Sequence, residues 1–184
     1  MCGITGIFGL EGLTDPRQVV AAMNRALAHR GPDASGVWAD DHVAFGHQRL
    51  SIIDLGHASD QPFLSLDGRY TLVFNGEIYN YRELRAQLEP TGWVFRTASD
   101  TEVLLAAFAT WGEACLHRLF GMFAFALWDA KKEELFLARN RMGSAIPDRG
   151  NRAQLTRNLG LAKARHRKCA DSILRCLSSL CCPT

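Results

Sequence analysis

The sequence predicts an α+β protein in which helices pack on stacked β-sheets. The first reason is the order of its segments: strand-like runs dominate the first half, two helical segments follow, and two more strand-like runs come later, so strands and helices do not alternate as βαβ units. The second reason is composition, since 47% hydrophobic and 22% charged residues are ordinary values for a globular protein. The third is the length of 184 residues, which suits one domain with its own core, with or without an appendage.

The first 75 residues are predicted to contain four strands and one helix. Residues 2–9 alternate small and apolar side chains, which is typical of a buried strand. Asp15 and Pro16 favour the start of a helix, whose apolar residues recur at helical spacing until a breaker at residues 29–33. Three shorter strand-like runs follow, at 36–39, 43–50 and 70–75.

The middle of the chain is predicted to form two helices, at residues 79–88 and 100–111. Ser99 or Asp100 is expected to cap the second helix, because short polar side chains accept hydrogen bonds from the free N–H groups of a first turn. Glu102 lies in that first turn, which is a further signal of a helix start.

Residues 122–129 and 134–138 are expected to pair as a β-hairpin. The first run is apolar and rich in aromatic side chains, and residues 130–132 form a short polar break before the second. Two strands that are separated by so few residues can pair only as antiparallel neighbours.

The composition changes abruptly near Gly143. Residues 1–144 carry 13 Lys and Arg against 17 Asp and Glu, a net charge of −4, whereas residues 145–184 carry 8 against 2, a net charge of +6. Four of the six cysteines lie in these last residues, and none of the aromatic side chains does. We therefore predict a folded domain over residues 1–143 and an unassigned, basic, Cys-rich tail over residues 144–184.

The tail is predicted to be disordered or marginally helical, because its apolar stripes are short and its charge is high. Those stripes consist of Leu155, Leu159, Ile173, Leu177 and Leu180. Its histidine and cysteines do not have the spacing of a known zinc site, so no metal site is predicted. The basic residues are not interleaved with aromatic ones, which argues against a nucleic-acid partner.

No segment of the sequence predicts a membrane partner. The longest apolar stretch, residues 120–128, is too short to cross a bilayer as a helix. The first residues have no basic segment before an apolar run, so they do not read as a secretory signal. A cytoplasmic location is therefore expected.

Cys2 is the first residue in the chain that could act as a catalytic group. If Met1 is removed, the thiol of Cys2 lies beside a free α-amine of the same residue, and a nucleophile then has its own base. The alternative is that Cys2 is a small buried strand residue, since free cysteine often behaves as a hydrophobic side chain. Position alone does not decide between the two.

Seven short motifs change that balance, because together they resemble one family. In chain order they are CGITGI at residues 2–7, HRGPD at 29–33, RLSIID at 49–54, NGEIYN at 75–80, SDTE at 99–102, FGMFAFALWD at 120–129 and ARNRMG at 138–143. This series resembles the N-terminal glutaminase domain of glutamine-hydrolysing asparagine synthetases, which are class II glutamine amidotransferases of the N-terminal-nucleophile (Ntn) hydrolase fold. The resemblance covers residues 1–143 and implies a four-layer α/β/β/α sandwich.

The resemblance ends where the composition changes. The family pattern continues into further strands, but the sequence from Ser144 onward is unrelated to it, so the sheet is expected to lack its last strands. Asn140 also stands where the family usually has Asp. These departures are the reason for the non-catalytic alternative given below.

Three residues would carry the catalysis that the resemblance implies. Cys2 would attack the side-chain amide of glutamine with its own α-amine as base. Asn75, through its side-chain amide, and Gly76, through its backbone N–H, match the oxyanion-hole positions, which stabilise developing negative charge. Without the resemblance, Asn75 and Gly76 read as a turn after a strand.

The resemblance also implies a set of substrate-binding residues. Arg49 would bind the α-carboxylate of glutamine, because a planar guanidinium suits a bidentate contact. Asp100 and Glu77 would hold the α-ammonium group, although they also read as a helix cap and a turn residue. Asn75 and Gly76 contribute here as well, and the wall of the pocket would consist of Leu50, Ser51, Ile52 and Ile53. His29 and Arg30 are expected to be structural.

Together these residues predict hydrolysis of glutamine to glutamate and ammonia, as the nitrogen-supplying half of an asparagine synthetase-like enzyme. This half needs no cofactor, because ATP and Mg belong to a synthetase half that the sequence lacks: it contains no Gly-rich phosphate-binding loop. Glutamine is the expected partner, and a separately encoded synthetase subunit is a candidate for a second one. The alternative is a non-catalytic truncated remnant or a glutamine-binding regulatory module.

Overall fold

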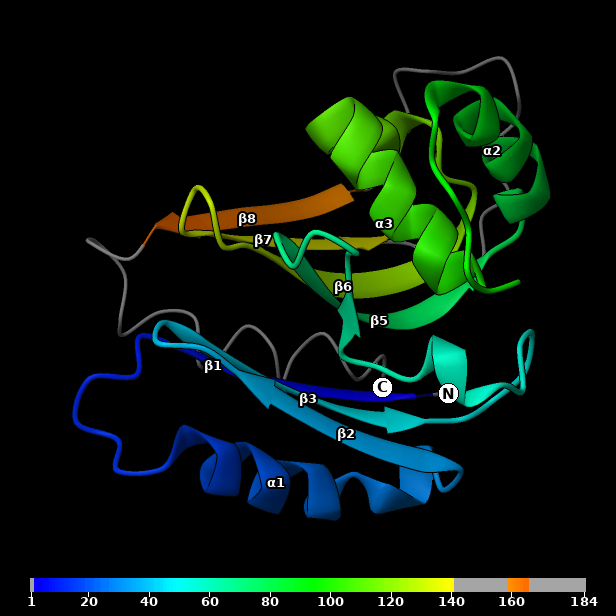
Figure 1. Cartoon of the computed structure of the whole chain (residues 1–184). Helices are drawn as coiled ribbons and strands as arrows, with labels where there is room; N and C mark the ends of the chain where they lie inside the picture. The colour runs from blue at the N-terminus through cyan, green and yellow to red at the C-terminus, as the bar shows by residue number, and fades with distance from the viewer. Residues whose placement is uncertain (1, 141–158, 166–184) are drawn as a thin grey trace.

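Two β-sheets lie face to face, and helices cover both outer faces (Figure 1). The arrangement comes from a computed structural model that describes residues 2–140 and 159–165. Helix α1 (Pro16–Ala26) forms the lowest layer in Figure 1, and helices α2 (Tyr81–Leu88) and α3 (Asp100–Trp111) form the top layer. The predicted four-layer α/β/β/α sandwich is therefore confirmed.

The three-stranded sheet carries the N-terminus of the chain. It consists of β1 (Gly3–Phe8), β2 (Ala34–Ala39) and β3 (Val43–Arg49), in the spatial order β1-β3-β2, and all of its pairs are antiparallel. Gly3 lies opposite Gln48. This register brings Cys2 to the C-terminal end of β3, where Arg49 ends the strand.

Helix α1 is tied to this sheet by one buried side chain. The Asp15 side chain caps the helix by accepting a hydrogen bond from the Gln18 N–H at 3.1 Å, as the sequence predicted. Asn24 on its inner face donates to the carbonyl oxygen of Gly36 at 2.9 Å and accepts a hydrogen bond from the Thr5 hydroxyl at 2.7 Å. The helix is therefore held in register with both β1 and β2.

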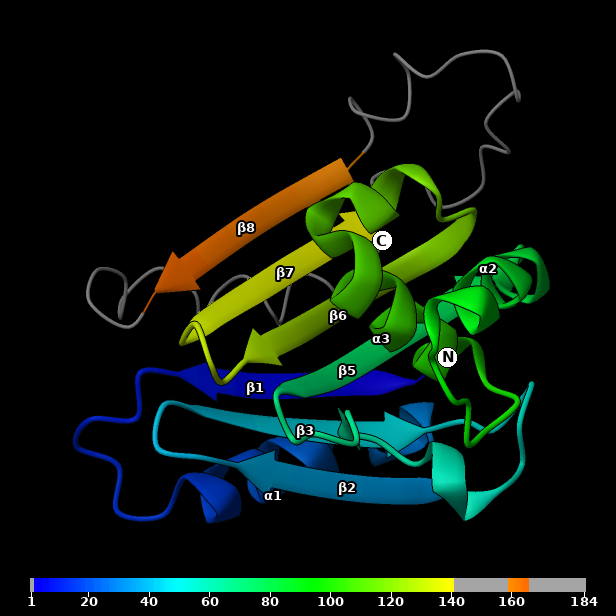
Figure 2. The same cartoon turned by 45° about the horizontal axis from the view of Figure 1, so that its top comes forward.

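The five-stranded sheet has the order β4-β5-β6-β7-β8, again with antiparallel pairs. Its strands are β4 (Phe63–Leu64), β5 (Tyr70–Ile78), β6 (Gly121–Asp129), β7 (Glu134–Asn140) and β8 (Leu159–Arg165). Strands β6 and β7 pair as a hairpin, which confirms the predicted one. Strand β5 contacts β1, so the two sheets meet near the site described below (Figure 2).

Strand β8 corrects the prediction for one part of the tail. Residues 159–165 were predicted to be disordered or marginally helical, but they pair with β7 along its whole length. The physical reason is that β7 offers an open edge of N–H and C=O groups, which an extended segment can satisfy. The sheet thus has one strand after β7, and the other stretches of the tail lie outside the described residues.

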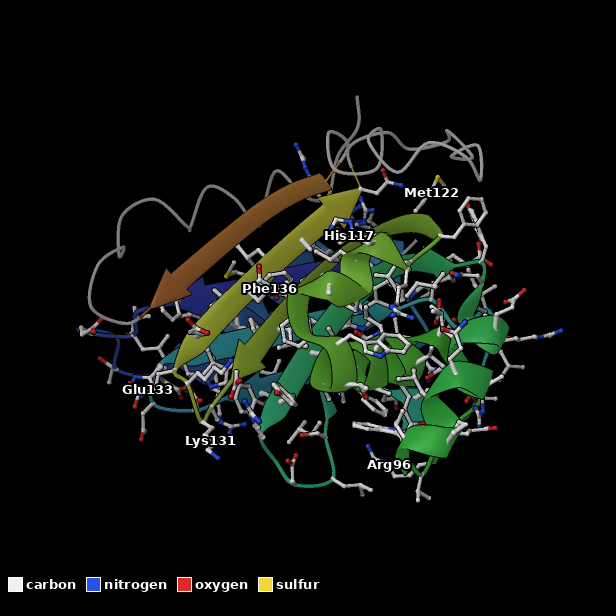
Figure 3. The ribbon with its side chains drawn as sticks, turned by 90° about the horizontal axis from the view of Figure 1, so that it is seen from above. Arg96, His117, Met122, Lys131, Glu133 and Phe136 are labelled. Atoms are coloured by element: carbon white, nitrogen blue, oxygen red, sulfur yellow. The ribbon has the colours of Figure 1, made fainter. Side chains whose placement is uncertain are left out.

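The interface between the two sheets is apolar. Phe8 and Phe45 from one sheet pack with Trp128 from the other, and the ring centroids of Phe8 and Trp128 are 6.0 Å apart. A second core lies between the five-stranded sheet and its helices, where Phe136 of β7, labelled in Figure 3, packs against Phe108 of α3 at a centroid distance of 4.9 Å. Burial of such large rings supplies much of the stability of a domain.

Helix α3 begins where the sequence predicted. The Ser99 hydroxyl accepts a hydrogen bond from the Glu102 N–H at 3.2 Å and so caps the helix. The buried Glu102 carboxylate reaches back to the N–H groups of Arg96, at 3.0 Å, and Thr97, at 2.7 Å. The segment before the helix is therefore bound to its first turn, and this fixes the position of Asp100.

Short 3-10 helices occupy several of the connections. They are η1 (Ala28–Arg30), η2 (His57–Ser59), η3 (Glu89–Thr91) and η4 (Gly112–His117). Among the helices of residues 2–140, none is long and apolar enough to cross a membrane.

Candidate active site

A cavity of about 140 Å³ opens where β3, β5 and the start of α3 converge. A cavity of roughly 150 Å³ is large enough to hold a small molecule such as benzene. Nine of the ten residues that the sequence predicted for the site line this cavity, and only Ser51 does not. The nine are Cys2, Arg49, Leu50, Ile52, Ile53, Asn75, Gly76, Glu77 and Asp100. Residues that are far apart in the sequence thus meet at one place.

Cys2 presents its sulfur at the start of β1. The Leu50 N–H donates a hydrogen bond to Sγ at 3.3 Å, and the thiol lies 3.6 Å from the carbonyl oxygen of Leu50. The Arg30 Nε donates to the Cys2 carbonyl oxygen at 3.2 Å. These contacts hold Cys2 in place. Its side chain is still partly exposed and lines the cavity.

Arg49 supplies positive charge at one wall. Its Nη1 donates to Asp60 Oδ1 at 2.5 Å and to the carbonyl oxygen of Gly56 at 2.8 Å, and its Nη2 donates to the carbonyl oxygen of Asp54. The side chain is buried. The guanidinium has five N–H donors, so these contacts orient it without using all of them.

Asn75 and Gly76 lie on β5 beside β6. The Oδ1 of Asn75 is buried and has no hydrogen-bond partner among the described residues. Gly76 has φ +155°, and a Cβ there would lie 2.3 Å from the carbonyl oxygen of Met122 on β6. Only glycine fits such a close approach of two backbones. Figure 3 shows Met122, which also lines the cavity, near the start of β6.

Asp100 supplies negative charge at the first residue of α3. Its Oδ2 accepts a hydrogen bond from the Ile78 N–H at 3.0 Å, and the residue is only 6% exposed. Burial raises the pKa of its carboxyl group to about 6. The backbone hydrogen bonds oppose this rise, and the nearby Glu77 charge contributes to it. A cationic group placed beside Asp100 would offset the free-energy cost of keeping this buried carboxylate charged.

Ser51 lies apart from the other predicted wall residues. It lines a neighbouring cavity together with Asp33 and His57, and its N–H donates to Asp33 Oδ2 at 2.7 Å. Leu50, Ile52 and Ile53 line the main cavity. Consecutive residues of an extended loop point to different sides, which is why one of the four differs.

Several residues at the cavity had no role in the sequence-based prediction. Asp54 accepts hydrogen bonds from the Gly56 N–H at 2.8 Å, the Ser59 hydroxyl at 2.8 Å and the Ala98 N–H at 3.0 Å. The first two of these bonds hold the pKa of its carboxyl group below the usual range. Asp54 thereby ties the loop after β3 to the segment before α3.

The remaining lining residues are Ser59, Gln61, Phe74, Ser99, Thr101 and Met122. Asp54 and Ser99 lie inside two of the motifs found in the sequence, at residues 49–54 and 99–102. Membership of these motifs could have predicted that both residues lie at the site. Gln61 and Phe74 lie outside those motifs, and their contribution depends on contacts between distant segments.

Arg30 and His29 were expected to be structural. Arg30 contacts the start of the first strand through the carbonyl oxygen of Cys2, whereas His29 is exposed.

The residues described by the structure contain no cluster of three or more His, Cys, Asp or Glu side chains that could hold a metal ion. Asn140, which departs from the family pattern, donates from its side-chain amide to the carbonyl oxygen of Gly121 at 2.7 Å.

The cavity combines four chemical elements. A thiol lies at one wall, a strand with a close-fitting glycine and an amide oxygen without a partner among the described residues lies at a second, and a cation and an anion lie at the others. Opposite charges on two walls suit a zwitterion such as an amino acid. A thiol beside hydrogen-bond donors suits attack on a carbonyl carbon.

Comparison with known proteins agrees with this geometry. A family model described as "Glutamine amidotransferase domain" matches residues 1–147. The glutamine-hydrolyzing asparagine synthetase 1 of Bacillus subtilis (strain 168) is 45% identical over 146 residues, which are 78% of this chain and 23% of that protein. Asparagine synthetase B of Escherichia coli (strain K12), also glutamine-hydrolyzing, is 40% identical over 144 residues, 78% of this chain and 26% of that protein.

A solved structure is similar as well. The glutamine phosphoribosylpyrophosphate amidotransferase of B. subtilis superposes with a TM-score of 0.61 and 26% identity, over 77% of this chain and 37% of that one. The chain spans about a quarter of the length of the two curated relatives named above.

Proposed function

Because the chain belongs to the glutamine amidotransferase domain family, we propose that it hydrolyses the side-chain amide of glutamine to glutamate and ammonia. The observation that carries this proposal is the convergence of Cys2, Arg49, Asn75, Gly76 and Asp100 on one small cavity. Each of them matches a need of the reaction: a nucleophile, oxyanion donors, and two charges of opposite sign.

Glutamine would bind through both of its charged groups. Its α-carboxylate would contact the donors of Arg49 that the Asp60 carboxylate and the loop carbonyls leave available. Its α-ammonium would contact Asp100, with Glu77 adding negative charge nearby. Two charged contacts at one end of the substrate distinguish glutamine from a simple amide and leave the amide group toward Cys2.

The reaction would proceed through a thioester. The Cys2 sulfur attacks the amide carbon, and its proton passes to the α-amine that removal of Met1 exposes. The amide oxygen becomes negatively charged and is stabilised by the Asn75 side-chain amide and the Gly76 N–H. The C–N bond breaks as the α-amine returns the proton to the leaving nitrogen, which departs as ammonia. Water then attacks the thioester carbon, and glutamate leaves with Cys2 regenerated.

The resemblance to asparagine synthetases favours a more specific role. We propose that the ammonia serves amide transfer to an acceptor carboxylate, as in a glutamine-hydrolysing asparagine synthetase. The activation of such an acceptor would need a nucleotide-binding part, and the chain spans only about a quarter of those relatives. We propose a synthetase subunit that binds the nucleotide as the partner of this domain.

The proposal is tested by measuring ammonia and glutamate formation with the purified chain, together with its intact mass. We expect activity only in molecules that lack Met1, and none in Cys2→Ala. Cys115→Ala is the matched control, because Cys115 is the other free cysteine of residues 2–140 and lies buried in the helix-side core. Full activity with Met1 attached would contradict the mechanism. A folded chain that binds glutamine without hydrolysing it would identify a non-catalytic module instead.

A further inference from the structure

The peptide groups of Phe74 lie at a place where the sheet has no neighbouring strand. Strand β4 pairs only with Thr71 and Leu72 of β5, so it ends before Phe74. On its other side β5 pairs with β6, and Phe74 lies opposite Phe125. A buried N–H or C=O without a partner costs free energy comparable to a lost hydrogen bond.

Two side chains take the place of the missing strand. Gln61 Oε1 accepts a hydrogen bond from the Phe74 N–H at 2.6 Å, and His47 Nε2 lies 3.0 Å from the Phe74 carbonyl oxygen. Gln61 comes from the segment before β4, whereas His47 comes from β3 of the opposite sheet. The two peptide groups that flank the Cα of Phe74 are thus each held by one side chain, and the contact with His47 joins the two sheets.

Both side chains are themselves buried and oriented. Gln61 is 7% exposed, and its Nε2 donates to the Thr101 hydroxyl of α3 at 3.3 Å. His47 is fully buried. A carbonyl oxygen can only accept, so His47 Nε2 must carry the hydrogen, and its Nδ1 has no partner among the described residues.

The charge state of His47 suits this role. Burial lowers its pKa to about 4, the hydrogen bond to Phe74 opposes that shift, and the charges of Arg49 and Asp60 act on it in opposite directions. At neutral pH the ring is therefore uncharged and donates a single hydrogen bond.

We propose that His47 and Gln61 are positioning residues that clamp the Phe74 peptide and thereby hold Asn75 and Gly76 in place. This inference rests on the proposed glutamine hydrolysis, in which those next two residues of β5 supply the oxyanion donors. His47 makes its hydrogen bond to the backbone of Phe74, and Gln61, although it lines the cavity, uses its side-chain amide on the Phe74 N–H and the Thr101 hydroxyl. Each of the two side chains binds the backbone of Phe74, and Phe74 directly precedes Asn75 and Gly76 on β5.

The clamp matters because donors aimed at developing charge work only in one geometry. A misplacement of about 1 Å can lower the rate by roughly a hundredfold. The α-carboxylate and α-ammonium contacts, by contrast, are made by Arg49 and Asp100 on other elements. Loosening the clamp is therefore expected to lower kcat far more than it raises KM.

The first experiment compares variants of the two clamp residues. In His47→Leu we expect kcat to fall by about tenfold to a hundredfold, with KM within about threefold of the wild type. His47→Gln places a donor at a similar reach and is expected to recover most of the loss. Gln61→Met is expected to lower kcat in the same range.

Gln48→Met is the matched control. Gln48 is a buried glutamine on β3, but its Nε2 donates to the carbonyl oxygen of Asn24 and to the Ser35 hydroxyl, away from β5. We expect it to lower stability and leave kcat near the wild-type value. Equal losses of kcat in Gln48→Met and Gln61→Met, or wild-type kcat in folded His47→Leu, would overturn the proposal.

A second measurement does not depend on activity. ¹⁵N NMR of the wild-type chain is expected to show His47 as the neutral tautomer with hydrogen on Nε2, and the amide signals of residues 75 and 76 should shift in Gln61→Met more than in Gln48→Met. Hydrogen on Nδ1, or unchanged signals, would overturn the clamp even if His47→Leu fails to fold. A wild-type chain without glutaminase activity would instead contradict the proposed function, and the NMR would still decide on the clamp.

Discussion

Arg49 and Asn75 line the same cavity, but the proposed mechanism gives them different parts of glutamine. Arg49→Lys is expected to raise KM by about tenfold or more with a small effect on kcat, because a point charge cannot replace a planar set of donors at a carboxylate. Asn75→Ala is expected to lower kcat by roughly a hundredfold with a modest change in KM, because it removes an oxyanion donor. Steady-state kinetics checks both.

Circular dichroism and the free energy of unfolding should be measured on both variants, since Arg49 also binds Asp60 and the loop carbonyls. If the two variants change KM and kcat in the same proportion, the division between substrate binding and catalysis is wrong.

Asp100 is expected to make stability depend on pH. Its folded pKa of about 6 lies above the ordinary value of an aspartate, so the folded state holds a proton that the unfolded state has lost between about pH 4 and 6. The free energy of unfolding should therefore fall by on the order of 2–3 kcal/mol as the pH rises through that window, and stay level above it.

Asp100→Asn is the comparison, because an amide oxygen can still accept the Ile78 N–H and does not titrate. Urea unfolding of both proteins from pH 4 to 7 gives the difference curve. We expect Asp100→Asn to be the more stable protein at pH 7 and the weaker binder of glutamine. Parallel stability curves would mean that burial does not perturb Asp100.

At the scale of elements, the pairing of β5 with β6 leaves no room for a side chain at Gly76. In Gly76→Ala the new Cβ would meet the carbonyl oxygen of Met122 and the Cα of Phe123, both backbone atoms that cannot move aside. We expect the free energy of unfolding to fall by about 1–3 kcal/mol. Chemical denaturation measures it.

Gly68→Ala provides the control for the effect of backbone conformation alone. Gly68 has φ +69°, but no atom lies within 4 Å of a Cβ placed there. In Gly68→Ala the free energy of unfolding should therefore fall only because alanine disfavours the left-handed conformation, by about 1–2 kcal/mol. Glutamine hydrolysis should survive Gly68→Ala and be lost in Gly76→Ala. Retained activity in a well-folded Gly76→Ala protein would contradict the close fit of β5 and β6.

At the scale of the whole molecule, the four layers bring the ends of two sheets together, and the cavity of the candidate site lies where they meet. The sequence of 184 residues has no Gly-rich phosphate-binding loop. Supplied with glutamine, aspartate and ATP-magnesium, this chain alone is therefore expected to form glutamate and ammonia but no asparagine. Mass spectrometry of the reaction mixture checks this, and asparagine formed by the purified chain would contradict it.

Local features of this protein were predictable from the sequence because they depend on neighbouring residues. Ser99 and Asp100 as possible caps, with Glu102 in the first turn, located the start of α3, and the polar break at residues 130–132 located the β6–β7 hairpin. The motifs likewise brought Cys2 and Arg49 forward as site residues.

Other features depend on contacts between segments that are distant in the sequence, and only the tertiary structure decided them. Strand β8 forms because β7 offers an open edge, although its own residues suggested a helix or disorder. Ser51 faces a neighbouring cavity, which its position in a motif did not indicate. His47 had no predicted role, since the peptide that it binds is 27 residues further along the chain and reaches it only when the two sheets stack.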